Sequence, residues 1–200
     1  MPTISPAPSD VEHVRSLLPE LSLIRDPRVA EAVATIWAYL WRASQYEQLE
    51  DAPVSPDLRK RRLIDQVRCV TMIAVDTARR LKEYHGIETN QDHVVAAGLL
   101  LDASKLVEYF PDDADVLART RIRNLLPHSY LSAEAARQLN LPDEIVHLVL
   151  YHTPRVLLNP SMVEAIVLQG ADLTAVDCLY FDSGKLTARL RRDPEAGNIK

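Results

Sequence analysis

Four side chains of metal-binding types occupy notable positions in this sequence. Asp102 follows the apolar run 99–101, which predicts that its carboxylate is buried. A buried carboxylate is costly unless it is paired or binds a metal. His128 precedes a predicted helix, His152 ends another, and Asp172 interrupts a later apolar stretch. Imidazole and carboxylate ligands together suit zinc, iron or manganese. Spacing alone is a weak signal, because single histidines usually have structural roles.

Helices must position these residues. The chain has 200 residues with 47% hydrophobic content and only five glycines, a balance that favours helix. Apolar residues recur at three- and four-residue spacing, and no alternating strand pattern is present. We therefore predict an all-α fold. The expected helices cover residues 10–18, 27–44, 56–84, from Asn90 toward Asp102, a short turn at 106–110, 114–120, 131–139, 142–151 and 160–182.

Several boundaries have specific signals. Asp26 and Pro27 form a capping side chain followed by proline at the first helical position. Gly86 is placed to end the long helix that precedes it. Gly98 lies inside a predicted helix, where it predicts close packing against a neighbour. Trp37 and Trp41 share one helix, and we interpret them as core residues or as a packing surface between subunits.

Charge and composition exclude some classes of function. The net charge of −5 gives no basic character of the kind that nucleic-acid binding requires. The basic run 59–62 is interpreted as a solvated helix face, with an anion contact as the alternative. No apolar run is long enough for a membrane span, and no signal peptide is evident, so a cytoplasmic protein is expected. Cys69 and Cys178 lie in apolar helical patterns and are expected to be buried free thiols.

Five ordered segments resemble the HD superfamily of metal-dependent phosphohydrolases. The stretch 99–105 (LLLDASK) is similar to the signature in which His-Asp is followed three residues later by Lys. Segment 64–70 resembles the helix that bears the family's first histidine, and segment 128–134 resembles the next histidine segment. Segment 141–152 resembles the helix that presents a further histidine, and segment 170–172 resembles the segment with the final aspartate. The resemblance implies a compact helical HD-like bundle at 55–183. It would be preceded by an arm and helical extension at 1–54 and followed by a charged tail at 184–200.

The sequence departs from the family at two ligand positions. Gln66 stands where the family has its first histidine, and Leu101 replaces the histidine of the His-Asp pair. In the family those histidines hold the first metal together with two aspartates, so the usual single-metal site is not expected. Members with two metals hold the second through the paired aspartate and the two later histidines. Asp102, His128 and His152 are all present here, with Asp172 expected as a further ligand. The resemblance implies one divalent ion (Mn, Fe, Zn or Ni) or none.

The resemblance also implies roles for neighbouring side chains. Asp102, Lys105 and His128 are the expected catalytic residues, and Lys105, Gln66 and Tyr130 are the expected substrate contacts. Lys105 has a simpler alternative role in a salt bridge with Glu108 or another nearby acid. Helix position also places four side chains near the same pocket: Tyr130, Tyr151, Asp65 and Arg68. Asp65 could replace the missing ligand only if its helix were rotated by one residue.

Three functions remain open at this stage. The first is a hydrolase of a small phosphorylated or related organic substrate that uses the residual metal site. The second is a metal-free protein on the same scaffold, either a ligand-binding or regulatory module or an enzyme with new acid–base chemistry. The third is an interaction protein that forms a homodimer through the Trp37 and Trp41 helix and the N-terminal extension. In the first two cases the expected partner is a small molecule.

Overall fold

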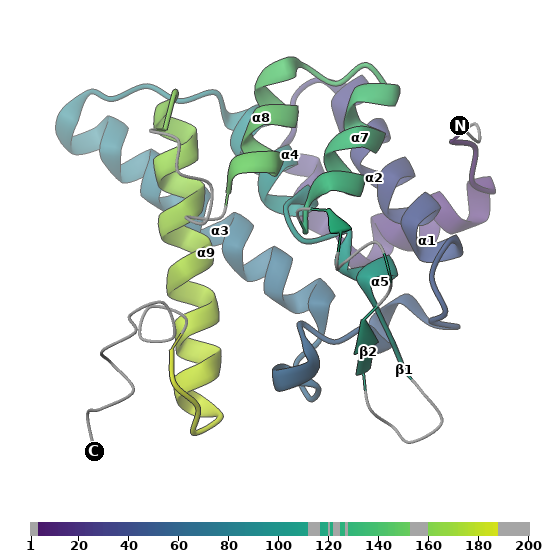
Figure 1. Cartoon of the computed structure of the whole chain (residues 1–200). Helices are drawn as coiled ribbons and strands as arrows, with labels where there is room; N and C mark the ends of the chain where they lie inside the picture. Colours follow the sequence, from purple (N-terminus) through teal and green to yellow (C-terminus); the bar gives the residue numbers. More distant parts are fainter. Residues whose placement is uncertain are drawn as a thin grey trace.

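The computed structural model describes residues 4–111, 117–119, 121, 125–126, 128–152 and 160–187. Figure 1 shows a bundle of helices in which α7 and α8 lie side by side and the long helix α9 crosses α3. The α-helices are α1 (Pro8–Leu17), α2 (Pro27–Arg42), α3 (Leu63–His85), α4 (Gln91–Leu100), α5 (Lys105–Glu108), α7 (Tyr130–Gln138), α8 (Asp143–Tyr151) and α9 (Val163–Asp182). Short 3₁₀ helices are η1 (Pro19–Leu23), η2 (Leu49–Asp51) and η3 (Pro56–Leu58). The all-α prediction is confirmed.

One local prediction is wrong. The helix predicted at 114–120 is replaced over 117–119 by strand β2 (Leu117–Arg119), which pairs with β1 (Tyr109–Pro111). The short turn predicted at 106–110 is present as α5 up to Glu108, and β1 follows it. The strands are antiparallel, with Tyr109 opposite Arg119. Residues 112–116 and 120 lie outside the described part of the chain. Pairing between the strands satisfies backbone groups that a short isolated helix would leave at its ends, and it overrides a weak local helix preference.

Capping residues set the helix boundaries as predicted. The Asp26 carboxylate accepts a hydrogen bond from the Arg28 amide, and Pro27 is the first residue of α2. Gly86 ends α3 with a φ of 66°, a left-handed conformation that glycine adopts without strain.

The long helix begins later than predicted, at Leu63, because residues 59–61 form a turn and bend after η3 and Arg62 forms a β-bridge with Pro53. The basic run is therefore not a helix face, and two of its members form ion pairs, Arg61 with Asp182 and Arg62 with Asp65.

The two tryptophans belong to the core. Trp37 and Trp41 are both buried. The Trp37 indole donates a hydrogen bond to the Leu99 carbonyl at 2.8 Å, and the Trp41 indole donates to the Tyr46 carbonyl at 3.1 Å. Of the two interpretations, core residues or a packing surface between subunits, the core interpretation is confirmed, since this chain encloses both rings. Through Trp37, helix α2 is joined to α4, so the N-terminal helices share one core with the rest of the bundle.

The two cysteines are exposed, contrary to the prediction of buried thiols. The apolar pattern around Cys69 is real, but the buried face of α3 follows Leu63, Val67, Val70 and Ala74. Cys69 lies off that stripe because two residues from Val67 is a rotation of about 200° around a helix.

Gly98 allows α4 to approach α3 closely. A Cβ atom at residue 98 would lie 2.7 Å from Thr71 Oγ1 and 3.2 Å from Thr71 Cα. The Thr71 hydroxyl is itself held by a 2.7 Å hydrogen bond to the Val67 carbonyl, so it cannot move aside without losing that bond. The prediction that Gly98 permits close helix packing is confirmed.

This contact predicts opposite effects for two glycine-to-alanine changes. Gly98→Ala should lower the free energy of unfolding by about 1–3 kcal/mol, because the clash with Thr71 outweighs alanine's better helix propensity. Gly170→Ala, in α9, meets no atom within 4 Å and should raise stability by about 0.5–1 kcal/mol. Urea denaturation followed by circular dichroism would measure both. A stabilising Gly98→Ala would contradict the assigned packing role.

Asp10 and Arg42 join α1 to α2. Two hydrogen bonds run from the Arg42 guanidinium to the Asp10 carboxylate, at 2.8 Å from Nε and 2.5 Å from Nη2. Although burial opposes it, the side-chain hydrogen bonding with Arg42 lowers the pKa of Asp10 below its ordinary value of 3.8. A carboxylate with a lowered pKa in the folded state stabilises the fold above its unfolded pKa and loses that contribution as the pH falls through the folded value.

Asp10→Asn should therefore lower the melting temperature near neutral pH. The difference from the wild type should shrink as the pH is lowered through 3.8 and below, because the wild-type carboxylate is then protonated too. Melting curves of both proteins over this pH range would test it. Glu12→Gln, an exposed change on the same helix, is the control and should show little effect at any pH. A difference that grew on acidification would contradict the assignment.

Candidate metal centre

A helical hairpin brings two histidines together. Helices α7 and α8 are joined by residues 139–142, and Asn140 takes a left-handed φ of 56° there. A short connection makes the two helices antiparallel, so the start of α7 lies beside the end of α8. His128 precedes α7 by two residues, and His152 caps the end of α8. The ring centroids of the two histidines are 4.7 Å apart, with planes at 88°.

Helix α4 supplies the third member of the site. It begins at the Asn90 cap, its residues from Val94 to Leu100 are all buried, and it packs against α8. Asp102 lies in the turn that follows and is 2% exposed. Its Oδ1 atom is 3.4 Å from His128 Nε2 and 4.0 Å from His152 Nε2. One ligand atom from each of the three residues lies within 4.8 Å of the others.

Lys105 occupies the other side of the Asp102 carboxylate. Its Nζ atom donates a 2.7 Å hydrogen bond to Asp102 Oδ2, so the two carboxylate oxygens face different partners. Burial alone would raise the pKa of Asp102, but the charge of Lys105, joined by those of His128 and His152 when they are protonated, outweighs it and lowers the pKa. Burial would likewise lower the pKa of Lys105, and the charges of Asp102 and Asp172 raise it instead. Asp102 and Lys105 are therefore both ionised near neutral pH. A buried group without an oppositely charged partner would instead favour its neutral form.

The three convergent residues fit a divalent metal ion. His152 Nδ1 lies 2.8 Å from the Val149 carbonyl, which can only accept, so Nδ1 carries the ring proton and Nε2 carries the lone pair. That Nε2 is buried and has no hydrogen-bond partner among the described residues. An orphaned buried acceptor is costly unless something binds it. Two imidazoles and one carboxylate are a usual ligand set for zinc, iron or manganese.

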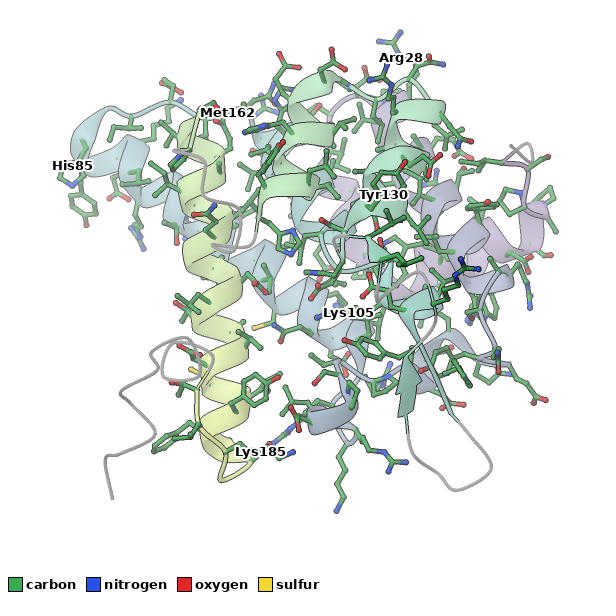
Figure 2. All side chains as sticks on the ribbon, viewed as in Figure 1. Arg28, His85, Lys105, Tyr130, Met162 and Lys185 are labelled. Carbon is green, nitrogen blue, oxygen red and sulfur yellow. The ribbon has the colours of Figure 1, made fainter. Side chains whose placement is uncertain are left out.

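Two other predicted site residues lie near this group without joining it. Asp172, on α9, is close enough for its charge to act on Lys105, but it is not among the three residues whose ligand atoms converge. Its role as a metal ligand stays a prediction. Tyr130 is the first residue of α7 and is partly exposed. In the view of Figure 2 it lies above Lys105.

Gln66 is buried on α3. It is 4% exposed, and its Nε2 donor has no hydrogen-bond partner among the described residues. Helices α3 and α4 are antiparallel neighbours, and Thr71 lies against Gly98. Leu101 itself is fully buried in the apolar core and offers no ligand atom.

Two of the other residues placed near the pocket by helix position point elsewhere. Asp65 is exposed and pairs with Arg62 at 3.4 Å, so α3 is not rotated to bring a carboxylate inward. Arg68 forms two hydrogen bonds with Glu20, at 2.9 and 3.0 Å. The outward directions of Asp65 and Arg68 follow from the burial of Gln66 and Val67, since neighbouring side chains on a helix diverge by about 100°.

Several polar residues that form hydrogen bonds between the elements of the site are not among the residues predicted from the sequence. Ser104 and Ser132 are both buried, and their hydroxyl oxygens lie 2.6 Å apart. Ser129 donates to the Leu150 carbonyl at 3.3 Å, and Gln169 donates to the Tyr151 carbonyl at 2.9 Å. A signal was present for two of them, because Ser104 follows Asp102 by two residues and Ser129 directly follows His128.

Comparison with known proteins supports this assignment of the fold. A family model described as the HD domain matches residues 67–177, more than half of the chain, beginning just after Gln66. The dihydroneopterin 2′,3′-cyclic phosphate phosphodiesterase of Methanocaldococcus jannaschii is 29% identical over 128 residues, which is 62% of this chain and 51% of that protein. The chain thus spans about half the length of this relative. No solved structure shows a significant match.

The HD match includes Asp102, His128 and His152 and ends within α9. None of the described helices combines the length and the apolar run needed to cross a bilayer. The buried cluster therefore lies in the segment that the family model covers, and the chain belongs to the HD domain family.

Proposed function

We propose that this chain is a metal-dependent hydrolase that acts on a small phosphoester. The observation that carries the proposal is the convergence of Asp102 Oδ1 with the Nε2 atoms of His128 and His152, next to a partly buried lysine. The similarity to a cyclic phosphate phosphodiesterase favours a phosphodiester as the substrate class. Mn, Fe, Zn or Ni would be held by Asp102, His128 and His152. Such an ion would supply Lewis acidity for a phosphoryl oxygen and lower the pKa of a nearby water.

The side chains around the ligands have separate tasks in this proposal. Lys105 provides a positive charge beside the reacting phosphoryl group, where it stabilises the negative charge that develops. It is 16% exposed, enough to be reached from the solvent side while its ammonium stays on Asp102. Asp172 keeps Lys105 charged, consistent with its effect in raising the pKa of that lysine.

Gln66 and Tyr130 are the proposed substrate contacts. The Gln66 carboxamide is a buried donor with no hydrogen-bond partner among the described residues, and a phosphate oxygen would satisfy it. Tyr130 is at the start of α7, two residues after His128, and its partly exposed ring is suited to packing against the organic part of the substrate. Leu101 and Gln66 leave this chain with a single metal, because neither offers an imidazole.

Metal analysis and a chelation experiment test the proposal. Protein purified without chelators should contain about one transition metal ion per chain by mass spectrometry. Hydrolysis of bis(p-nitrophenyl) phosphate and of 2′,3′-cyclic nucleotides should stop after dialysis against a chelator and return with Mn, Fe, Zn or Ni. Absence of bound metal, with no activity restored by any of the four, would overturn the proposal.

A metal-free enzyme is the competing function, and one observation favours it. Asp102 and the two imidazoles already lie within 4.8 Å of one another, and a histidine beside a carboxylate can act as a general base. Activity that survived complete removal of metal would favour this function over the first. The two are therefore separated by the same experiment.

A further inference from the structure

The last three carbonyls of α8 each accept a side-chain donor from around the site. Val149 O accepts from the His152 ring at 2.8 Å, Leu150 O accepts from Ser129 Oγ at 3.3 Å, and Tyr151 O accepts from Gln169 Nε2 at 2.9 Å. Carbonyls at a helix end have no partner within the helix. Here they fix the His152 ring, the turn that carries His128, and helix α9. The end of α8 thus acts as a common anchor.

A second link joins the Asp102 turn to α7. Ser104 Oγ lies 2.6 Å from Ser132 Oγ and also accepts a 2.9 Å hydrogen bond from the Ser132 amide. Both serines are essentially inaccessible to solvent, at 1% and 0% exposure. Ser104 shares a turn with Asp102, and Ser132 lies in the first turn of α7, just after His128. The bond therefore ties one candidate ligand to the element that carries another.

We propose that Ser104, Ser132 and Ser129 are positioning residues for the metal centre. This inference rests on the proposed function. A buried hydroxyl costs free energy unless it is bonded, and alanine would fill the same space in a helical bundle without that cost. Instead the chain places three serines within four residues of its ligands and bonds each across to another element. Three ligands on separate elements need such links, because their relative positions set the affinity for the ion.

The two ends of the Ser104–Ser132 bond predict graded effects. Ser104→Ala removes both hydrogen bonds and leaves the Ser132 amide and hydroxyl without their partner. Ser132→Ala leaves the bond from its own amide to Ser104 intact. We expect the dissociation constant for Co²⁺ to rise by about 10-fold or more in Ser104→Ala and by less in Ser132→Ala and Ser129→Ala. The visible absorption spectrum of bound Co²⁺ should change in Ser104→Ala, since the ligands shift.

The experiment is a Co²⁺ titration of the full 200-residue chain, followed by visible absorption. Two controls separate positioning from general destabilisation. Ser22→Ala removes an exposed hydroxyl that bonds to Pro19 O at 2.8 Å, far from the site along the chain, and should leave binding unchanged. Val14→Ala removes methyl groups from a fully buried residue of α1 and should lower the apoprotein melting temperature while leaving the Co²⁺ affinity unchanged.

The outcomes distinguish this inference from the function on which it rests. Wild-type affinity and spectrum in Ser104→Ala would overturn the inference alone. Equal weakening in Val14→Ala and Ser104→Ala would also overturn it, since destabilisation would then explain the loss. A wild-type chain that binds no Co²⁺ would overturn both the proposed function and the positioning role. The inference is supported if the Co²⁺ affinity falls most in Ser104→Ala and less in Ser132→Ala and Ser129→Ala, while both controls keep the wild-type Co²⁺ affinity.

Discussion

Replacing Asp102 with asparagine is expected to abolish metal binding and hydrolysis together. The substitution keeps the shape of the side chain but removes the charge from Oδ1, the atom that faces both imidazoles. A neutral amide is a poor ligand for a transition metal. Loss of a partner outside the ligand shell already costs on the order of 10- to 100-fold in affinity, so loss of a ligand should cost at least that. Metal content by mass spectrometry and phosphodiester hydrolysis would be measured on the same preparations.

The same change has a consequence for stability. Lys105 would lose the carboxylate that compensates its buried charge, and breaking a buried pair typically costs about 3–5 kcal/mol. Asp76→Asn is a matched control, because Asp76 is exposed and pairs with Arg79 on the surface of α3. It should leave metal content, activity and melting temperature nearly unchanged. Full activity in Asp102→Asn would be incompatible with the metal-dependent function.

Replacing Lys105 with methionine is expected to separate metal binding from catalysis. Methionine keeps most of the apolar stem but cannot stabilise negative charge. We expect kcat for the phosphodiester to fall by roughly 100- to 1000-fold, the loss seen when one stabilising donor is removed from an active site. Asp102, His128 and His152 are untouched, so about one metal ion per chain should still bind. Steady-state kinetics and metal analysis would test both halves.

Metal should also become more important for the stability of this variant. Without Lys105 the buried Asp102 carboxylate loses its 2.7 Å ion pair, and the apoprotein should melt at a lower temperature than the wild type. A divalent cation on Oδ1 would offset part of that loss, because ligand binding stabilises the folded state. The gain in melting temperature on adding Zn²⁺ should therefore be larger in Lys105→Met than in the wild type. Lys82→Met, which removes an exposed lysine paired with Glu88, is the control. Unchanged kcat in Lys105→Met would remove Lys105 from the catalytic group.

The two variants together distinguish the tasks of neighbouring charges. Both substitutions break the ion pair between Asp102 and Lys105, but Asp102→Asn should lose the metal ion and Lys105→Met should keep it. If both lost metal equally, Lys105 would be a structural partner of Asp102 with no separate part in the reaction. If neither lost activity, the metal-free alternative would also fail, since that function needs Asp102 beside a histidine.

The sequence determined the helices and several of their ends. Asp26 and Pro27 begin α2, Asn90 begins α4, and Gly86 ends α3, because each supplies or permits the backbone geometry that a helix terminus needs. These are local effects within a few residues. The candidate ligands Asp102, His128 and His152 could also be selected from local segments and their resemblance to a family. The hairpin of α7 and α8 then explains why two of them meet.

Tertiary packing decided how the helices are rotated and which side chains cross between them. Cys69 is exposed and Gln66 is buried because the buried stripe of α3 is set by α4 and α9 together, and one residue along a helix turns a side chain by about 100°. The short pairing of β1 with β2 likewise depends on a partner strand and not on local preference.

The candidate metal centre shows the same division between local and tertiary effects. The residue types of its three candidate ligands are local information, but their separations are set by packing between elements. Hydrogen bonds between these elements join Ser104 to Ser132, and Ser129 to a carbonyl at the end of α8. A serine that bonds across a helix interface has no periodic pattern or cap signal, because its partner is 28 residues away along the chain. The sequence by itself thus determined which side chains could bind a metal, and only the tertiary structure decided that three of them converge, since distances between remote residues are set by packing.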